Sequence, residues 1–501
     1  MTRSFSFAAL VSLVLGASAL SADVVREWRP KERWRGFNLE GYGLKGSFSG
    51  RIEEDDMRWI REFGFNFVRI MVDHHYLMSD ADLTKPDAAK FGFLDEAIAM
   101  GRRHGLHVNL CLSIPPGVDY KVTRSKAVLF DDLQVQKVLA DYWRFIAARY
   151  RGVPNDDLSF NLFNEPNTEP KDDEYVRLIA RCLKAIREED PGRFVIADGL
   201  NNGRRPEPGA TVFGNLAQSL HAYEPMSVSH HRAPWCKAQS GFPAWPPPPV
   251  VTPVFGSRKP AELRRPIVIR DVPACRLTVK VGLVNRGGEV FVRADGRELV
   301  RRLYVPKGGE PGWTNLTARS GGEWAGQPLE PIVVDLPACA RLEIGVGTGD
   351  WLGIDRIAFA ADGRCSEVVP FFDYGAAQRP RSDVWFAGFD GPAVAANAEK
   401  RPETGADWLG RNVLPEWDRL LATGQQVVVG EFGFYCHTPH EIGLRWLEDN
   451  LREFKARGLG WALWNFRGGF GVLDSNRKDV DYEDFHGHKL DRKLLDLLQR
   501  Y

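Results

Sequence analysis

Short apolar runs alternate with longer amphipathic stretches from about residue 34 to residue 231. The runs are typical of buried strands and lie at 65–72 (FNFVRIMV), 106–112 (LHVNLCL), 158–163 (LSFNLF) and 194–197 (FVIA). Between them, the segment 51–63 follows Ser49 and ends before Gly64, as a helix with an N-cap and a C′ glycine would. A later helix has one apolar face, formed by Val135, Val138, Leu139, Tyr142 and Ile146.

This alternation of strands and helices predicts a parallel sheet, either doubly wound or closed into a barrel. No GxGxxG motif opens a helix after the first strand, which disfavours a dinucleotide-binding fold.

The pattern changes after His231, where a proline run (Pro246–Pro249) leads into alternating strands with turn signals. Convincing amphipathic helices are missing from about 250 to 365. We therefore predict an inserted β-sandwich of about a hundred residues or more. The expected division is a signal peptide at 1–22, a first barrel part at 23–231, the inserted domain at 232–399 and a last barrel part at 400–501.

The alternation resumes with predicted helices at 407–421, 441–457 and 489–498 and predicted strands at 427–430 (VVVG) and 460–464 (GWALW). With further strands at 36–39 and 218–221, the count reaches eight, which is the number of a (β/α)8 TIM barrel. The fold class is thus α/β, with the insert after the sixth strand.

Composition and the N-terminus narrow the class of protein. Lys+Arg and Asp+Glu number 66 each, so the net charge is zero and a nucleic acid partner is disfavoured. Residues 1–22 are expected to be a signal peptide, because Arg3 precedes an apolar stretch at 7–16 and small residues follow. That stretch is shorter than the ~20 residues needed to span a bilayer. We expect an extracellular or periplasmic protein that has no membrane contact after cleavage. The seven cysteines form no CxxC or zinc motif and are expected to be mostly buried free thiols.

Polar residues gather where the predicted strands end, which is where barrel enzymes build their sites. Arg69 lies late in the second strand, and Asn164 and Glu165 end the fourth. His221 and Tyr223 end the sixth, Glu431 the seventh and Trp464 the eighth. Two carboxylates on separate strands suit glycosidic bond cleavage, in which one donates a proton and the other attacks the anomeric carbon.

These motifs resemble glycoside hydrolase family 5, the cellulase family. The resemblance rests on Asn164-Glu165-Pro166, His221-Ala222-Tyr223 and Glu431-Phe432-Gly433, with RGFNLEG at 35–41, GFNFVRI at 64–70 and GWALWNF at 460–466, in the family's order. It implies that Glu165 is the acid/base and Glu431 the nucleophile of a retaining mechanism. It further implies that Arg69 lies near Glu431, that Asn164 binds the sugar 2-hydroxyl, and that Tyr223 bonds the nucleophile. His221 would line the same subsite, and Trp464 would form its floor.

One departure concerns the third strand, which normally ends in a His that contacts the sugar. Here Ser113 takes that place, His107 is expected in the core, and His104 precedes the strand. We expect altered specificity more than lost activity.

Several tryptophans are further candidates for substrate contact. Trp235 and Trp245 lie nearer the barrel rim and are expected to contact substrate. For Trp313, Trp324 and Trp351 in the insert we favour a core role over carbohydrate binding.

The sequence thus predicts a secreted retaining glycoside hydrolase that cleaves a β-linked glucan or mannan without a metal or organic cofactor. Its partner would be a polysaccharide or oligosaccharide. Two alternatives remain open: a non-catalytic carbohydrate-binding protein on the same fold, and a transglycosylase with the same mechanism.

Overall fold

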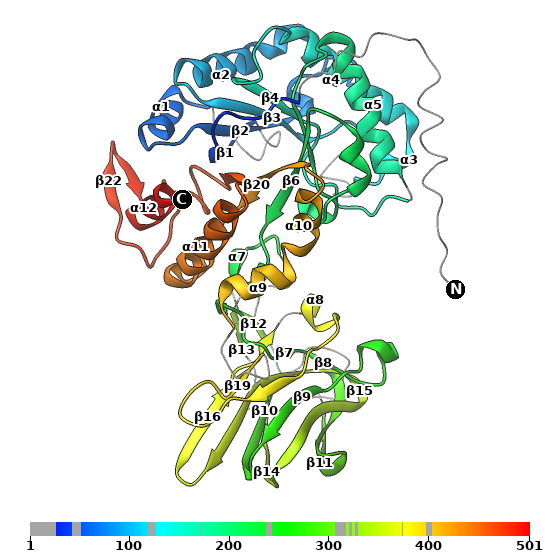
Figure 1. The fold of residues 1–501 in the computed structure, drawn as a ribbon, viewed down its shortest axis with the longest axis vertical. Coiled ribbons are helices and arrows are strands. Elements are labelled where there is room, and N and C mark those ends of the chain that lie inside the picture. The colour runs from blue at the N-terminus through cyan, green and yellow to red at the C-terminus, as the bar shows by residue number, and fades with distance from the viewer. Residues whose placement is uncertain are drawn as a thin grey trace.

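The computed structural model describes residues 27–42, 52–118, 126–171, 173–236, 243–305, 317–319, 323–325, 329–372, 374–396 and 403–501. They form a barrel and a smaller β domain, with helix α9 (Gly405–Asn412) near the junction (Figure 1). The predicted signal peptide and Trp313 lie outside the described residues, as does the side chain of Trp324.

Eight parallel strands close into a barrel in the order β1-β2-β3-β4-β5-β6-β20-β21, with β21 pairing back to β1. The predicted barrel and its eight strands are confirmed. The strands are β1 Arg35–Tyr42, β2 Phe67–Asp73, β3 His107–Ile114, β4 Leu158–Asn161, β5 Val195–Asp198, β6 Leu216–Ala222, β20 Gln426–Phe432 and β21 Gly460–Leu463.

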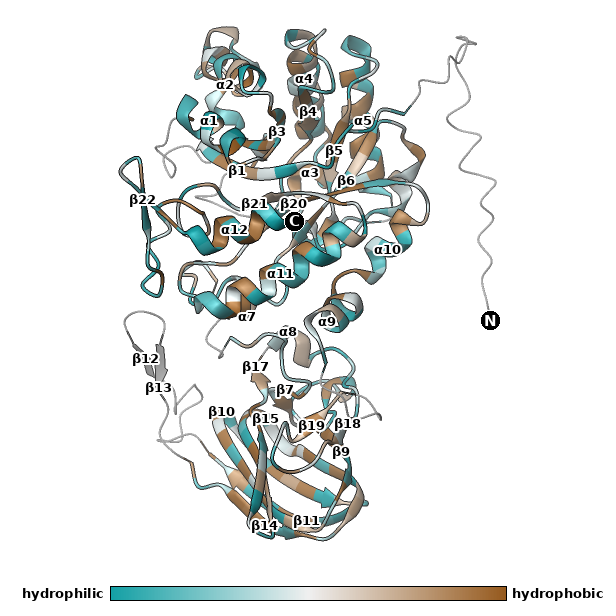
Figure 2. Cartoon of the chain, turned by 60° about the vertical axis from the view of Figure 1, so that its left-hand side comes forward, coloured by the Kyte–Doolittle hydropathy of each residue, from teal (hydrophilic) through white to brown (hydrophobic). Residues whose placement is uncertain are grey.

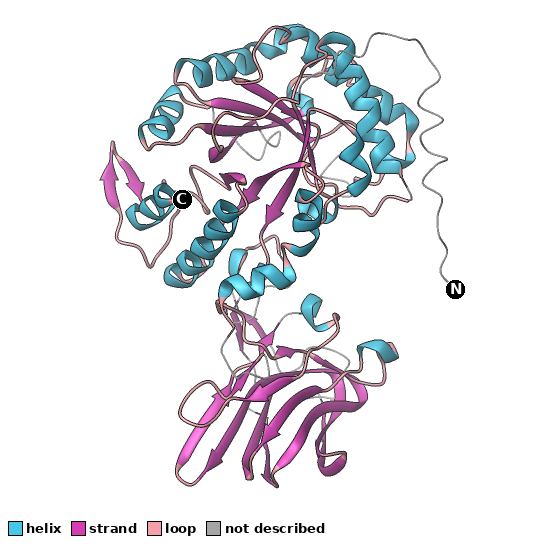
Figure 3. Ribbon diagram, viewed as in Figure 1, coloured by secondary structure: helices cyan, strands magenta, loops and turns pink. Residues whose placement is uncertain are grey.

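Helices surround these strands (Figure 3). The longer ones are α1 Glu54–Glu62, α2 Gly92–Arg103, α4 Leu133–Arg149, α5 Glu174–Glu189, α10 Pro415–Leu421, α11 His440–Ala456 and α12 Arg492–Arg500. Short ones are α3 Val128–Asp131, α6 Leu200–Gly203 and α7 Met226–Ser229, whereas α8 Tyr374–Ala377 lies in the segment inserted between β6 and β20. Single turns of 3-10 helix lie at His74–Tyr76 (η1), Ala88–Phe91 (η2), Pro208–Val212 (η3) and Ala261–Leu263 (η4). Helices such as α11 and α12 carry both hydrophobic and hydrophilic stripes (Figure 2), as expected of helices that cover a core.

Local chemistry explains where the helices deviate from prediction. Helix α1 ends before Gly64, which has a φ of 87° as expected, whereas Ser49 lies outside the described residues. The predicted helix at 407–421 is wrong as a single element, because Pro415 has no backbone N–H and begins a second helix, α10. The last helix begins later than predicted, since β23 (His488–Leu490) pairs with β22 (Glu483–Phe485), and Asp491 then caps α12.

Between β6 and β20 the chain forms the predicted inserted β domain. Hydrogen bonds join nine of its strands into one sheet within the described residues. The two longest, β10 (Cys275–Ala294) and β15 (Cys339–Ala361), pair with each other through several register shifts, where extra residues bend a strand. The remaining strands of this sheet are β8 Val254–Phe255, β9 Ile267–Val272, β11 Arg297–Tyr304, β14 Ile332–Leu336, β16 Arg364–Val368, β18 Val384–Phe386 and β19 Val394–Ala395. Two-stranded pairs join β7 Val251–Thr252 with β17 Phe371–Phe372, and β12 Thr317–Arg319 with β13 Glu323–Ala325.

The barrel and the insert have separate apolar cores. The amino-terminal end of the barrel is filled by a third cluster that includes Trp34, Phe67 and Phe194. His107 stacks on Phe67 there and is 4% exposed, so its predicted core position is confirmed. Because aromatic rings fill this end, the carboxyl ends of the strands are where a ligand site is expected.

Two other sequence predictions can be compared with the fold. The seven cysteines form no disulfide bonds with one another in the described part of the chain, and four of them are buried (Cys111, Cys182, Cys275 and Cys339), as predicted. No helix in the described part of the chain is both long enough and apolar enough to cross a membrane.

Candidate active site

The carboxyl ends of the barrel strands bring most of the predicted site residues together. Glu431 is the next-to-last residue of β20, and Glu165 follows β4. A carboxylate oxygen of Glu165, one of Glu431 and a ring nitrogen of His221 all lie within 4.8 Å of one another. Glu165 is the more open carboxylate, with 30% of its side chain exposed, whereas that of Glu431 is 5% exposed.

Glu431 is held by two donors from other strands. Nη1 of Arg69 donates to Oε1 at 2.8 Å, and the hydroxyl of Tyr223 donates to Oε2 at 3.0 Å. Burial and the carboxylates nearby raise the pKa of Tyr223 well above its usual value, which keeps it a donor. Both contacts favour the charged form of Glu431 and fix the orientation of its two carboxylate oxygens.

Arg69 is the hub of a buried network. Its side chain is 1% exposed, and it also donates to the side chains of Asn161, Asn164 and Asn38 at 2.9, 2.8 and 3.0 Å. Burial opposes its charge, but the surrounding negative groups, Asp198 and Glu431 among them, raise its pKa overall. Because the planar guanidinium has fixed donor directions, it sets the geometry of the acceptors around it.

Glu165 faces His221, whose Nδ1 lies 3.0 Å from Oε1. On the other side of the ring, Nε2 lies 3.0 Å from Oδ2 of Asp198. Burial works against a charged His221, but the carboxylates of Glu431 and Asp198 prevail and raise its pKa to about 10. The imidazole is therefore a buried cation between carboxylates.

The two glutamates beside His221 have pKa values that are shifted in opposite directions. Burial would raise the pKa of Glu165, but hydrogen bonding and attraction to His221 lower it. Burial and repulsion from Glu165 raise the pKa of Glu431 against the attraction of His221 and Arg69. The three groups thus form one coupled system in which a proton is shared across short distances.

A cation could in principle use the same atoms, but each is committed to a hydrogen bond. Asp73, His74 and His75 form a second such group, yet Nδ1 of His74 lies 2.9 Å from the carbonyl of Ile114, and Nδ1 of His75 lies 2.7 Å from Asp73. The prediction of no metal and no cofactor stays a prediction.

The other predicted residues occupy the rim with different exposures. Ser113 is buried at the end of β3. Trp464 is half-buried directly after β21, and its backbone N–H donates to the carbonyl of Phe432 at 2.8 Å. Trp235 is 47% exposed and meets the ring of Tyr435 edge-on at 5.0 Å. The ring of Phe470 lies between those of Trp235 and Tyr223, and its centroid is 6.3 Å from the Trp235 centroid and 6.4 Å from that of Tyr223.

Two tryptophan predictions can be tested by burial. Trp245 was expected to contact substrate, and this is wrong: it is 6% exposed, because its Nε1 donates to Asp449 at 2.8 Å and its ring packs on Trp408. Trp351 is 3% exposed in the insert, so the core role that we favoured for it is confirmed.

Three buried or half-buried ionisable residues of the site were missed from the sequence. Asp198 ends β5 and obeys the same strand-end rule as the others, so the signal was present. Glu40 near the end of β1 is also at the rim, where burial, with repulsion from Glu431, raises its pKa to about 8 against a hydrogen bond from Asn465. Lys126 precedes α3, where no local pattern marks it.

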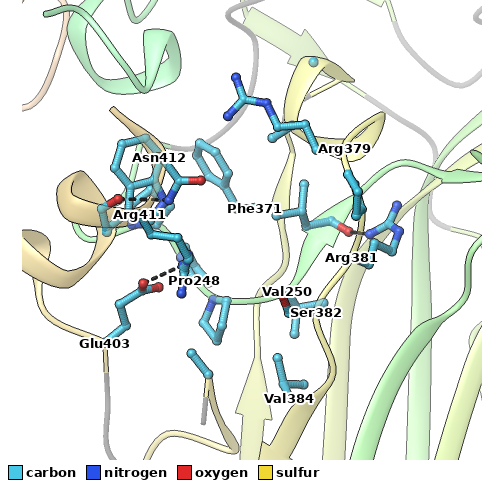
Figure 4. Close-up of a pocket in the computed structure, with 18 of the residues that line it drawn as sticks. Pro248, Val250, Phe371, Arg379, Arg381, Ser382, Val384, Glu403, Arg411 and Asn412 are labelled. Carbon is cyan, nitrogen blue, oxygen red and sulfur yellow. Dashed lines mark hydrogen bonds and ion pairs between the residues drawn. The ribbon is translucent and has the colours of Figure 1, made fainter. Parts of the chain in front are cut away.

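A separate cavity of about 400 Å³ lies between the barrel and the insert. Figure 4 shows Arg411 paired with Glu403 on one side of it, and Arg381 turned toward backbone carbonyls on the other. No predicted site residue lines it within the described part of the chain. The chemistry of the strand ends is therefore not in this cavity.

Comparisons with known proteins support the resemblance seen in the sequence. Residues 28–246 match the family model of cellulase (glycosyl hydrolase family 5). Endoglucanase C of Acetivibrio thermocellus is 29% identical over 221 residues, which cover 41% of this chain and 62% of that protein. Cellodextrinase A of Ruminococcus flavefaciens is 23% identical over 209 residues, or 40% and 61% of the two chains. The chain thus spans less than two thirds of the length of these relatives.

Solved structures show the same fold at low identity. A structure described as a glycoside hydrolase has a TM-score of 0.58 at 22% identity and covers 93% of this chain and 99% of its own. Cel5A of Thermotoga maritima, solved with cellobiose, has a TM-score of 0.51 at 16% identity and covers 93% and 98%. The family model ends before β20, so the match does not include Glu431.

Proposed function

From the confirmed resemblance of residues 28–246 to the cellulases of glycosyl hydrolase family 5, we propose that this chain is a glycoside hydrolase that cleaves a β-linked glucan or mannan with retention of configuration. The observation that carries the proposal is the approach of Glu165 and Glu431 to within 4.8 Å at the open end of the barrel. Retaining enzymes hold their two carboxyl groups ~5–5.5 Å apart, whereas inverting enzymes leave ~6.5–9.5 Å for a water.

In the first step, Glu431 attacks the anomeric carbon while Glu165 protonates the departing oxygen, so that the glycosidic C–O bond breaks as the glycosyl–Glu431 ester forms. In the second step, Glu165 as carboxylate takes a proton from water, the water oxygen attacks the same carbon, and Glu431 is released. The hydrogen bonds from Arg69 and Tyr223 orient both carboxylate oxygens of Glu431.

The proton that Glu165 needs is available from its neighbour. His221 is cationic, and its Nδ1 lies 3.0 Å from Oε1 of Glu165. When a bound sugar covers Glu165, the loss of water favours the neutral carboxyl, and transfer of the Nδ1 proton leaves a neutral imidazole beside a protonated acid. His221 thus both lowers the pKa of Glu165 and holds the proton that Glu165 would take up when a sugar is bound.

The remaining substrate contacts are proposed from the family resemblance. Asn164 would bond the 2-hydroxyl of the reacting sugar, Trp464 would lie under its ring, and Ser113 would face it where a His is usual. Trp235 offers an exposed aromatic face farther out, where a second sugar can stack.

The substrate class is taken from relatives. Two of them are an endoglucanase and a cellodextrinase, and Cel5A of Thermotoga maritima was solved in complexes with cellobiose and with mannotriose. We further propose export through the segment 1–22 and a sandwich-like packing of the inserted domain around its own core.

The test is the release of reducing sugar from β-glucans, mannans, xylans and their oligosaccharides. Glu431→Gln and Glu165→Gln should each lower the rate at least about 10³-fold on one substrate class. Glu188→Gln is the matched control and should leave the rate unchanged, because Glu188 is an exposed glutamate of α5 that pairs with Arg144 of α4.

The configuration of the first product, followed by NMR, tests retention. Activity that survives in Glu431→Gln would remove the assigned nucleophile. Tight binding of oligosaccharides with no turnover would favour a binding protein, and transfer to added sugar in place of water would favour a transglycosylase.

A further inference from the structure

Lys126 is buried beside the proposed acid/base residue. The residue is 1% exposed, although lysine is among the residues least often buried. Nζ donates to the backbone carbonyls of Asn164 and Glu165, the latter at 3.0 Å. The backbone N–H of Lys126 donates to Oδ1 of Asn167 at 2.9 Å. Lys126 therefore ties the segment after β3 to the turn that carries Glu165.

That turn has a backbone conformation that needs support. Glu165 has a φ of 46°, in the left-handed region that a glutamate rarely adopts. The backbone N–H of Glu165 donates to Oδ2 of Asp198 at 2.9 Å, and its carbonyl accepts a hydrogen bond from Nζ of Lys126. A buried anion thus holds one end of the residue and a buried cation holds the other.

Burial makes this lysine costly to keep charged. Desolvation lowers its pKa, and the negative groups around it, Glu165 and Asp198 foremost, oppose the change. Within the described residues its hydrogen-bond acceptors are carbonyls and not carboxylates. An apolar side chain could fill the same space without this cost, so the ammonium serves the turn and the charge of the site.

We infer that Lys126 is a positioning residue for Glu165, which fixes the Asn164–Glu165 turn so that the carboxyl group is aligned with the departing glycosidic oxygen. The inference rests on the proposed function. It assigns to Lys126 no contact with substrate; the residue acts through the backbone of Glu165 and through its charge.

A purely structural anchor would behave differently in two measurements. Protonation by Glu165 matters for a sugar leaving group and hardly at all for 2,4-dinitrophenolate, which leaves unprotonated. A positioning defect is therefore selective for the leaving group, whereas a general loss of folded protein lowers both rates equally.

The charge of Lys126 also predicts a pH effect. The groups that face Glu165 are His221 on β6, Asp198 on β5, Glu431 on β20 and Lys126. Removing the positive charge of Lys126 raises the pKa of Glu165, so the acid keeps its proton to higher pH. The alkaline limb of the pH profile of kcat/KM should then move to higher pH.

The experiment compares Lys126→Met, Lys126→Gln and Lys126→Arg in the full chain, with Lys137→Met, an exposed lysine on α4, as control. On a β-linked oligosaccharide, we expect kcat/KM of Lys126→Met to fall about 30–100-fold, and on the 2,4-dinitrophenyl β-glycoside by less than about threefold. Lys126→Arg, which keeps the charge, should recover part of the loss and leave the alkaline limb near its original pH.

Equal losses on both substrates, or no loss on either, would overturn the inference. Circular dichroism identifies a variant that fails to fold, in which case Lys126→Gln, whose amide NH2 can still donate hydrogen bonds, gives the same comparison. If the parent protein turns over neither substrate, it is the proposed function that fails; if the parent is active and the ratio of the two rates is unchanged in the variants, only the role of Lys126 fails.

Discussion

Asp198→Asn is the most informative single substitution, because the change keeps the shape of a buried side chain and removes its charge. Oδ1 of Asp198 accepts from Asn161 at 3.0 Å, and Oδ2 accepts from the Glu165 N–H at 2.9 Å. Oδ2 also lies 3.0 Å from Nε2 of His221 and 3.4 Å from Nη2 of Arg69. In either orientation, the new amide NH2 would face at least one donor.

The size of the effect follows from these contacts. Breaking a buried ion pair by neutralising one partner costs about 3–5 kcal/mol, and Asp198 faces two buried cations. We expect unfolding to become easier by that amount. Because Asp198 helps to raise the pKa of His221, the same substitution lowers it, so that the proton shared by His221 and Glu165 is lost at a lower pH. A hundredfold fall in kcat/KM, or about 2.7 kcal/mol, is the expected order of the effect.

The assay is kcat/KM against pH on a β-linked oligosaccharide, together with denaturant unfolding followed by tryptophan fluorescence. The alkaline limb should move to lower pH in Asp198→Asn, because a negative charge near the shared proton has been lost. This is opposite to the shift expected for Lys126→Met, where a positive charge is lost. Asp141→Asn, on the surface of α4 with Lys137 and Arg144 as partners, is the control and should cost less than about 1 kcal/mol.

A rate within threefold of the parent and an unmoved alkaline limb would refute the view that Asp198 controls the proton on His221. Loss of stability without any change in the pH profile would leave Asp198 with a purely structural role.

Three further predictions use other parts of the barrel. Tyr223→Phe removes the 3.0 Å bond to Glu431, and since a hydrogen bond to a charged group contributes about 1.5–3 kcal/mol, kcat should fall about 10–100-fold in steady-state assays; an unchanged kcat would contradict this. Trp235→Ala should raise KM for longer oligosaccharides about 3–10-fold and leave kcat near that of the parent, whereas a loss confined to kcat would argue against stacking. Burial lowers the pKa of His107 to about 3, so the unfolded chain gains a proton below about pH 6.5 that the folded protein does not. Stability should therefore fall as the pH drops from about 6.5 toward 3, and His107→Gln should flatten this slope in denaturant titrations; a slope equal to that of the parent would exclude His107 as its source.

The sequence alone determined the elements of the barrel and the strand ends at which the candidate site residues lie. Buried parallel strands are continuously apolar, and their boundaries are marked by polar residues, so a run such as 158–163 followed by Asn164 and Glu165 is readable without a structure. The insert was readable because helical periodicity disappears over a domain's length. Pro415 was equally visible, and the single helix predicted across it neglected a strong local signal.

The tertiary structure decided which of these residues meet, and with what charge. Arg69 and Glu431 are 362 positions apart and lie 2.8 Å from each other only because the barrel closes. Lys126 carries no local sign of its burial, and Trp245 no sign that Asp449 and Trp408 enclose it. The pairing of strands within the insert was likewise undetermined, since long strands with register shifts have several possible partners. Local sequence sets periodicity and turns, whereas desolvation and charge coupling depend on every group within a few ångströms, and those groups come from all around the barrel.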